Sequence, residues 1–99
     1  YELHYAFYPM ATGYEKHRDV FQGDSRRVVS LVTYLNHEWK ASDGGELVLF
    51  REDNPARIER EIQPQFGRSV LFLSEKIPHQ VNLTNRERFS VTGWLKRSE

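Results

Sequence analysis

A histidine and a carboxylate lie one residue apart in the segment 14–19, whose composition is typical of an extended strand. Positions i and i+2 of a strand face the same way, so His17 and Asp19 are expected to point into the same space. A facial iron site uses two imidazoles and one carboxylate, so a second histidine is required. Of the other three histidines, His79 is best placed, because it follows Pro78 where a short strand is expected to begin. We therefore predict a metal site made of His17, Asp19 and His79.

An arginine follows the second histidine at a useful distance. Arg88 lies nine positions after His79 and opens a run in which residues 88, 90, 92 and 94 share one face of a strand. A histidine and an aspartate at this spacing are weak evidence alone, and a lone strand histidine is more often structural. The ordered set of two histidines, an aspartate and an arginine on strand-like segments is much stronger. Arg86 could in principle replace Arg88, but its spacing from His79 and the residues that follow favour Arg88.

The rest of the chain predicts an all-β fold of about eight short strands. The segments 28–35 and 69–73 are apolar on both faces, which is typical of strands covered on both sides. No amphipathic helix, repeat or low-complexity segment is evident. The pattern predicts a jelly roll, also called a double-stranded β-helix, in which two sheets face each other and enclose a site. The expected strands are residues 3–8, 14–19, 28–35, 46–50, 58–63, 69–73, a short one at His79, and 88–96.

Composition limits the possible functions. Ninety-nine residues allow one small domain, residues 1–99. Fourteen basic and fourteen acidic residues cancel, so the charge favours neither nucleic acid nor an anionic membrane as a partner. The absence of cysteine excludes disulfides and thiolate ligands. With no signal-peptide pattern and no apolar run of membrane-spanning length, we expect a cytoplasmic location. Because the chain opens at Tyr1 within a strand-like segment, we expect a fragment that lacks N-terminal elements.

These motifs and their flanking residues resemble the Fe(II)- and 2-oxoglutarate-dependent dioxygenases, and most closely their prolyl-hydroxylase-like branch. The similarity runs through nearly the whole chain. It comprises Tyr8-Pro9, Gly13-Tyr14 before His17-Arg18-Asp19, Val32-Thr33-Tyr34-Leu35-Asn36, Gly44-Gly45-Glu46-Leu47, Pro64 with Gly67-Arg68, Pro78-His79, and Arg88-Phe89-Ser90-Val91-Thr92-Gly93-Trp94.

The resemblance implies a reaction and a set of binding residues. It implies that Fe(II), 2-oxoglutarate and O2 react to hydroxylate a substrate, with succinate and carbon dioxide as co-products. It assigns the far carboxylate of 2-oxoglutarate to Arg88, whose guanidinium can grip a carboxylate through two parallel hydrogen bonds. Tyr34 and Thr92 match positions that border this carboxylate, and Tyr8 matches one near the metal-facing half of the co-substrate. Asp19 favours hydroxylation, because halogenating relatives replace this carboxylate with a small residue.

Several other residues have two interpretations. Arg26 and its neighbour Arg27 could contact an acidic substrate segment, although arginines at a strand entrance are more often only solvated. Trp94 shares the strand face of Arg88 and either walls the site or packs in the core. His4 and His37 have no motif partner and are expected to be structural or solvated.

The resemblance also predicts an exposed surface. In the family, helices that precede the barrel brace the larger sheet, and this sequence shows none of them. One apolar sheet face is then left without cover, and self-association through that face is expected.

Three functions remain open at this stage. The first is hydroxylation of a prolyl residue in a protein or peptide. The second is hydroxylation of a free amino acid or another small molecule. The third is an inactive jelly-roll module that binds a structural metal. The His-Arg-Asp triplet of protein kinases is excluded, because residues 20–23 lack the required continuation and no glycine-rich loop precedes it.

Overall fold

The computed structural model describes residues 2–18, 27–74 and 76–96 of the 99-residue chain. Short runs of β-branched and aromatic residues separated by glycine, proline and asparagine form strands, as their alternating pattern predicts. The only helical element of these ranges is a single turn of 3-10 helix, η1. The elements are β1 (Glu2–Tyr8), β2 (Tyr14–His17), β3 (Arg27–Tyr34), η1 (Ala41–Asp43), β4 (Leu47–Phe50), β5 (Ile58–Ile62), β6 (Ser69–Phe72), β7 (His79–Val81) and β8 (Arg88–Lys96).

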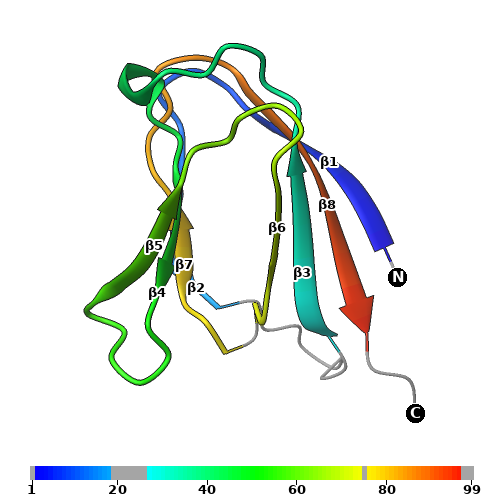
Figure 1. Cartoon of the computed structure of the whole chain (residues 1–99), viewed down its shortest axis with the longest axis vertical. Helices are drawn as coiled ribbons and strands as arrows, with labels where there is room; N and C mark the ends of the chain where they lie inside the picture. The colour runs from blue at the N-terminus through cyan, green and yellow to red at the C-terminus, as the bar shows by residue number, and fades with distance from the viewer. Residues whose placement is uncertain (1, 19–26, 75, 97–99) are drawn as a thin grey trace.

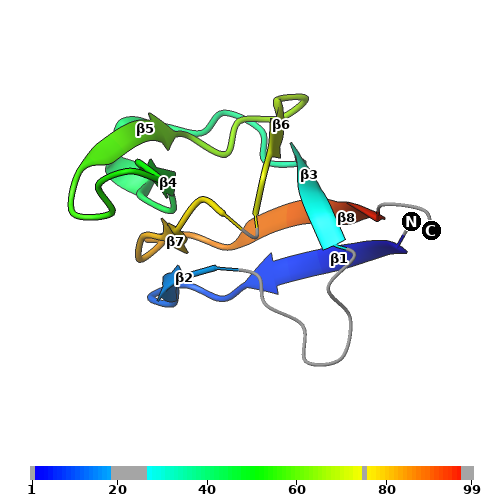
Figure 2. The ribbon, with the colours of Figure 1, turned by 90° about the horizontal axis from the view of Figure 1, so that it is seen from below.

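The strands form two antiparallel sheets that face each other (Figures 1 and 2). One sheet has the order β1-β8-β3-β6 and the other the order β2-β7-β4-β5. Consecutive strands cross from one sheet to the other everywhere except in the β4–β5 hairpin. This alternation is the jelly-roll arrangement, so the predicted fold class is confirmed.

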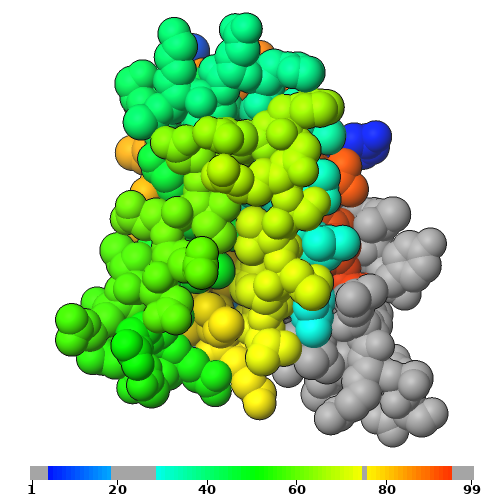
Figure 3. Space-filling view, viewed as in Figure 1, coloured from blue at the N-terminus to red at the C-terminus, as the bar shows by residue number. Residues whose placement is uncertain are grey.

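The space between the sheets holds the core. Tyr34, Leu47, Leu49 and Phe72 are buried there, and Val32, Ile62, Val70, Ile77 and Val81 pack around them. In the space-filling view, the segments that contain β5 and β6 form a continuous cover over one side of the molecule (Figure 3). Polar side chains are buried between the sheets as well, among them Ser30, Arg88 and Ser90.

One prediction about burial is wrong. The segment 69–73 was expected to be covered on both faces, but β6 lies at the edge of its sheet and Leu71 is 62% exposed. A continuous apolar run cannot distinguish a central strand from an edge strand whose outer side chains remain bare. The same outer face carries Tyr5, Phe7 and Phe89, which are also exposed. Among the described residues, nothing covers this apolar surface of β1, β8, β3 and β6.

Within the described ranges, the structure contains no helix with the length and apolar character needed to cross a membrane.

Candidate active site

A cavity of about 420 Å³ opens between the two sheets. Side chains that alternate along the strands point into it, so every second residue of β8 and of β3 contributes to the wall. Seven of the eight strands supply at least one lining residue. The wall consists of Ala6, Tyr8, Tyr14, His17, Ser30, Val32, Tyr34, Leu47, Phe72, His79, Val81, Arg88, Ser90, Thr92 and Trp94.

Two of the predicted metal ligands meet at one part of this wall. His17 ends β2 and His79 begins β7, and the antiparallel register places these two residues directly opposite each other. Their ring centroids are 4.3 Å apart. His79 is 6% exposed. The pairing of two short strands thus brings together two imidazoles that are 62 positions apart in the sequence.

Backbone carbonyls orient both imidazoles. His17 Nδ1 lies 2.7 Å from the carbonyl oxygen of Glu15, and His79 Nδ1 lies 2.9 Å from that of Ile77. A carbonyl oxygen can only accept, so Nδ1 carries the proton in each ring and Nε2 of the neutral ring carries the lone pair. Histidines that bind metals are commonly held in this way by their second nitrogen. The two rings are therefore prepared to offer Nε2 to a cation.

Aromatic neighbours restrict the same rings further. The ring of Tyr14 packs on His17 with a centroid distance of 4.2 Å. The ring of Phe72 meets His79 edge-on at 4.9 Å. Aromatic contacts of this kind favour the observed orientations of both imidazoles. Sequence reasoning gave Tyr14 and Phe72 no role in the site.

The predicted carboxylate ligand cannot be placed. Asp19 lies outside the described residues, as does Arg26, which was predicted to contact substrate. Within the described ranges, no group of three or more histidine, aspartate or glutamate side chains is close enough to hold a metal ion. The described part of the site therefore contains two of the three expected ligands.

Arg88 lies elsewhere on the cavity wall and is 2% exposed. Its Nε donates to the carbonyl oxygen of Gly45 at 2.8 Å, and its guanidinium carbon lies 5.0 Å from the Tyr8 ring centroid and 5.1 Å from that of Tyr34. No acidic side chain of the described residues forms an ion pair with it. Burial lowers the pKa of Arg88, and the neighbouring Tyr34 and Tyr8 oppose that shift. An arginine nevertheless stays protonated in proteins, so a buried positive charge faces the cavity without an acidic partner.

The Tyr34 hydroxyl beside Arg88 has no hydrogen bond of normal geometry within the described part of the chain. Tyr34 is fully buried, and its Oη forms no hydrogen bond with any described residue. Burial raises the pKa of Tyr34, and the positive charge of Arg88 opposes this. An orphaned buried hydroxyl costs free energy, as does an unpaired buried charge. A carboxylate between the two groups would accept hydrogen bonds from both and remove both penalties.

The two candidate arginines, Arg86 and Arg88, lie in different surroundings. Arg88 lines the cavity, as do Thr92, Trp94 and Tyr8, whereas Arg86 is bonded to the 37–43 segment and does not reach the cavity wall. His37 is exposed and stacks on Phe66 with a centroid distance of 4.2 Å, away from the cavity.

Two buried serines also line the cavity and were not among the predicted site residues. Ser30 and Ser90 are each 2% exposed. Ser30 Oγ donates to Ser74 Oγ at 2.6 Å. Strand parity could have found both serines, because Ser30 shares the face of Tyr34 on β3 and Ser90 that of Arg88 on β8.

The jelly roll thus encloses two paired imidazoles, which suit a metal ion, and a buried guanidinium with no acidic partner among the described residues, which suits an anionic small molecule. Residues 3–96 match the family described as the 2OG-Fe(II) oxygenase superfamily, and the chain belongs to this family. The family implies Fe(II), 2-oxoglutarate and O2 in general terms. The described residues fit these groups, because the Nδ1-anchored imidazoles suit a metal and the Arg88 and Tyr34 pair suits a carboxylate.

Sequence relatives come from the prolyl hydroxylases. The chain is 34% identical over 91 residues to human Egl nine homolog 1, and the match covers 90% of this chain and 21% of that protein. It is 37% identical over 98 residues to the hypoxia-inducible factor prolyl hydroxylase of Caenorhabditis elegans, covering 95% of this chain and 13% of that protein. The chain thus spans between 21% and 26% of the mammalian Egl nine homolog 1 proteins.

Two prolyl hydroxylases of known structure also resemble the chain. A prolyl-4-hydroxylase from Pseudomonas putida is 44% identical, with a TM-score of 0.87, and the match covers 97% of this chain and 52% of that one. A Trichoplax adhaerens prolyl hydroxylase in complex with a peptide fragment of the hypoxia-inducible factor oxygen degradation domain is 34% identical. Its TM-score is 0.82, and the match covers 94% of this chain and 42% of that one.

Proposed function

We propose that this chain is the catalytic barrel of an Fe(II)- and 2-oxoglutarate-dependent dioxygenase that hydroxylates a prolyl residue of a protein or peptide. One observation carries the proposal: a buried arginine and a buried tyrosine hydroxyl, which have no acidic partner and no hydrogen bond respectively among the described residues, face the same cavity as two oriented imidazoles. A core that served stability alone would not retain these polar groups at such cost.

His17, His79 and Asp19 would hold the ferrous ion. When bound, the ion supplies open coordination positions for 2-oxoglutarate and O2, and the coupled reaction converts 2-oxoglutarate to succinate and carbon dioxide. The carbonyls of Glu15 and Ile77 keep both imidazoles in the tautomer that ligation needs. The histidines would therefore bind the ion without a change of tautomer.

Arg88 would hold the far carboxylate of 2-oxoglutarate. Its Nε is already committed to Gly45, so the terminal nitrogens of the guanidinium are left for the anion. Tyr34 Oη would donate to the same carboxylate, and Thr92 would line the pocket beside it. Tyr8, whose ring faces Arg88, would flank the metal-facing half of the co-substrate. These groups orient 2-oxoglutarate by binding it at the end remote from the reaction.

The volume of the cavity limits how much of the substrate can enter it. A volume of about 420 Å³ accepts 2-oxoglutarate together with one small ring, so the rest of a peptide would remain at the mouth. Trp94 lines the cavity and would contact the inserted ring. Arg26 lies outside the described residues, and its contact with the peptide stays a proposal from the sequence. Support for a prolyl substrate comes from the relatives, of which the Trichoplax adhaerens enzyme was solved with a peptide.

Turnover with a defined peptide tests the proposal. Protein reconstituted with Fe(II) and supplied with 2-oxoglutarate and a pool of proline-containing peptides is expected to release succinate and to add one oxygen atom to prolyl residues, as seen by mass spectrometry. His79→Ala should abolish both signals. His37→Ala is the matched control and should keep them, because His37 is exposed and stacks on Phe66 outside the cavity.

The alternatives give different results in the same assay. Oxygen incorporated into free amino acids but not into peptides would replace the peptide substrate with a small molecule. A protein that binds iron but releases no succinate, and whose iron affinity is unchanged in His79→Ala, would contradict the enzyme assignment.

A further inference from the structure

The carbonyl that accepts a hydrogen bond from Arg88 belongs to a tightly constrained turn. Gly44 and Gly45 have φ angles of 70° and 69°, in the left-handed region that favours glycine. A Cβ on Gly45 would lie 3.0 Å from Trp39 Cζ2 and 3.2 Å from both Arg88 Cδ and Thr84 Cβ. Gly45 is thus wedged between Trp39 and Arg88. A movement of Trp39 would displace the carbonyl that holds Arg88 Nε at 2.8 Å.

Trp39 is held from two sides. Its indole Nε1 donates to the carbonyl oxygen of Gly44 at 2.9 Å, which ties the ring to the glycine turn. The guanidinium carbon of Arg86 lies 4.6 Å from the Trp39 ring centroid, within the range of a cation–π contact. Trp39 is 6% exposed, so the ring is enclosed by these contacts. The position of the glycine turn therefore depends on what holds Arg86.

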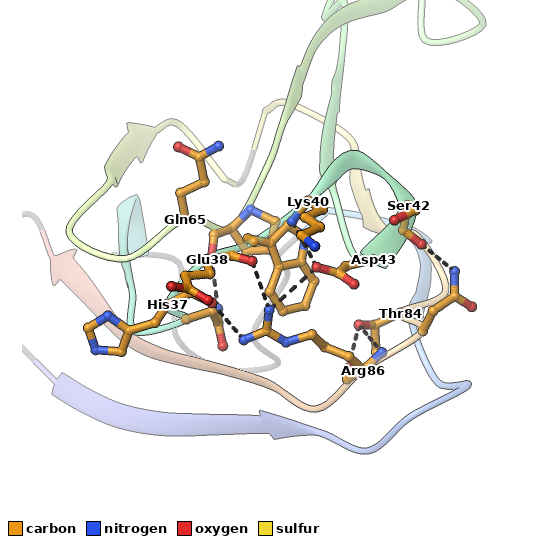
Figure 4. A network of polar contacts seen from close by, with 12 residues as sticks. His37, Glu38, Lys40, Ser42, Asp43, Gln65, Thr84 and Arg86 are labelled. Carbon is orange, nitrogen blue, oxygen red and sulfur yellow. Dashed lines mark hydrogen bonds and ion pairs between the residues drawn. The ribbon is translucent and has the colours of Figure 1, made fainter.

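Arg86 bonds to three acceptors along the 37–43 segment (Figure 4). It donates to the carbonyl oxygens of His37 at 2.8 Å and Glu38 at 3.2 Å, and it forms an ion pair with Asp43 Oδ2 at 3.4 Å. Asp43 Oδ2 also accepts from the Lys40 backbone N–H at 2.8 Å. A planar guanidinium can satisfy this divergent set, which a single ammonium group cannot. Arg86 therefore fastens the segment that carries Trp39 against the strand end that carries Arg88.

We propose that Arg86 is a positioning residue for 2-oxoglutarate. It holds Trp39 against the Gly44–Gly45 turn, the turn fixes the Gly45 carbonyl, and the carbonyl sets the direction of the Arg88 guanidinium. Two parallel hydrogen bonds to a carboxylate require that direction, because a rotated guanidinium keeps only one of them. The inference rests on the proposed function, since it takes Arg88 as the residue that holds the far carboxylate.

Two readouts test the proposal. The first is the dissociation constant of 2-oxoglutarate, measured by calorimetry on the Fe(II)-loaded protein without oxygen. The second is the Arg88 Nε–H resonance of the metal-free protein in a ¹⁵N-edited NMR spectrum. Arg86→Ala is expected to weaken 2-oxoglutarate binding roughly 3- to 10-fold, the effect of losing about one hydrogen bond, and to shift or broaden the resonance. Iron affinity should not change, because His17 and His79 belong to the other sheet.

Arg51→Ala is the matched control. Arg51 also pairs with an aspartate, with Nε 2.9 Å from Asp53 Oδ1, and it follows β4 at the opposite end of the molecule from η1 (Figure 1). Removing it should leave both readouts unchanged.

Charge and position are separated by two further variants. If Arg86 acted only by attracting the dianion, Arg86→Lys would restore full affinity and Asp43→Asn would tighten binding. If Arg86 acts by position, Arg86→Lys falls short of the parent. Asp43→Asn then weakens binding, because it loosens the contact that holds Arg86. The two explanations thus predict opposite signs for Asp43→Asn.

Clear outcomes overturn the inference. It is wrong if Arg86→Ala binds 2-oxoglutarate as tightly as the parent with an unmoved Arg88 resonance, or if Asp43→Asn binds more tightly. Should Arg86→Ala fail to fold, Trp39→Phe decides, since it removes both the indole N–H bond to Gly44 and the part of the indole that lies against Gly45. Unchanged affinity in Trp39→Phe then overturns the inference. If Arg88→Ala itself leaves 2-oxoglutarate binding intact, the proposed function fails instead.

Discussion

The two faces of the β1-β8-β3-β6 sheet have opposite character. On the cavity side, Arg88 and Ser90 are each 2% exposed, and Tyr34 is fully buried. On the outer side, the side chain between Arg88 and Ser90, Phe89, is 43% exposed, and Tyr5 on β1 is 85% exposed. An antiparallel sheet usually buries its apolar face and solvates its polar one. Here the inner face buries polar side chains among its apolar ones, and large apolar side chains are bare on the outer face among the described residues.

The contrast between the two faces separates side chains suited to ligand binding from side chains suited to packing. Burying a guanidinium without an acidic partner and a hydroxyl without a hydrogen bond, as among the described residues, costs stability, so their retention favours a binding role. Exposing several large apolar side chains on one face indicates a surface that another apolar surface covers. We therefore predict that the inner side of the sheet binds ligands and that its outer side is a contact surface. The four predictions below test this difference, from the largest expected effect to the smallest.

Removing a cavity imidazole should have the largest effect. His79→Ala is expected to abolish measurable Fe(II) binding, because one of two adjacent imidazoles is lost and the coordination of the ion is incomplete. Titration of the metal-free protein with Fe(II) under anaerobic conditions measures this. An unchanged iron affinity would show that the ion binds elsewhere.

Removing the buried Arg88 guanidinium should weaken the binding of 2-oxoglutarate alone. Arg88→Ala is expected to weaken 2-oxoglutarate binding by about 2 to 5 kcal/mol, or roughly 30- to 5,000-fold, because the carboxylate would be buried without its partner. Iron binding should be retained. Parallel titrations with Fe(II) and with 2-oxoglutarate distinguish the two sites. A comparable loss of both affinities would instead point to misfolding of the variant.

Making the outer face polar should reduce self-association without affecting the cavity. In Tyr5→Thr/Leu71→Thr, two exposed apolar side chains are replaced by β-branched residues that suit a strand. Each lost contact is worth about 1.5 to 3 kcal/mol if the face is covered in a dimer, so sedimentation velocity should show a marked shift to monomer. 2-oxoglutarate affinity should stay the same.

A matched substitution on the cavity side should lower stability without changing self-association. Val32→Thr on β3 faces the cavity and packs against the core, so it should lower the free energy of unfolding and leave self-association unchanged. If the double variant of the outer face associates as strongly as the parent, that face is not the contact surface.

Removing the orphaned hydroxyl should give the smallest effect, with opposite signs for stability and binding. Tyr34→Phe is expected to stabilise the ligand-free protein, because a buried hydroxyl without a partner is removed. The same change should weaken 2-oxoglutarate binding roughly 2- to 12-fold, the effect of one hydrogen bond. Thermal unfolding and calorimetry measure the two effects. Lower stability in the ligand-free variant would mean that the hydroxyl already has a partner.

The sequence predicted the fold well, because alternation along the strands is a local signal. The parity of residues 88–94 placed Arg88, Ser90, Thr92 and Trp94 on one face, and all four line the cavity. The edge position of β6 was missed, because an apolar run carries no information about which strands lie beside it.

The site was predicted only where residue type and order were informative. The pairing of His17 with His79 depended on matching distant segments, which the motif supplied. The role of Trp39 and of the Gly44–Gly45 turn depends on contacts between segments some 40 positions apart, and no spacing rule reveals those. Tyr14 was placed on the correct strand, but its packing on His17 is visible only in three dimensions.

The pairing of β1 with β8 has a consequence for biosynthesis. Among the described residues, β1 is hydrogen-bonded only to β8, and the paired residues lie 80 to 92 positions apart in the sequence. During synthesis, the backbone of β1 therefore cannot form these hydrogen bonds until β8 has been made, after most of the described barrel. Folding that depends on such distant pairing is slow and leaves strand edges open to wrong partners.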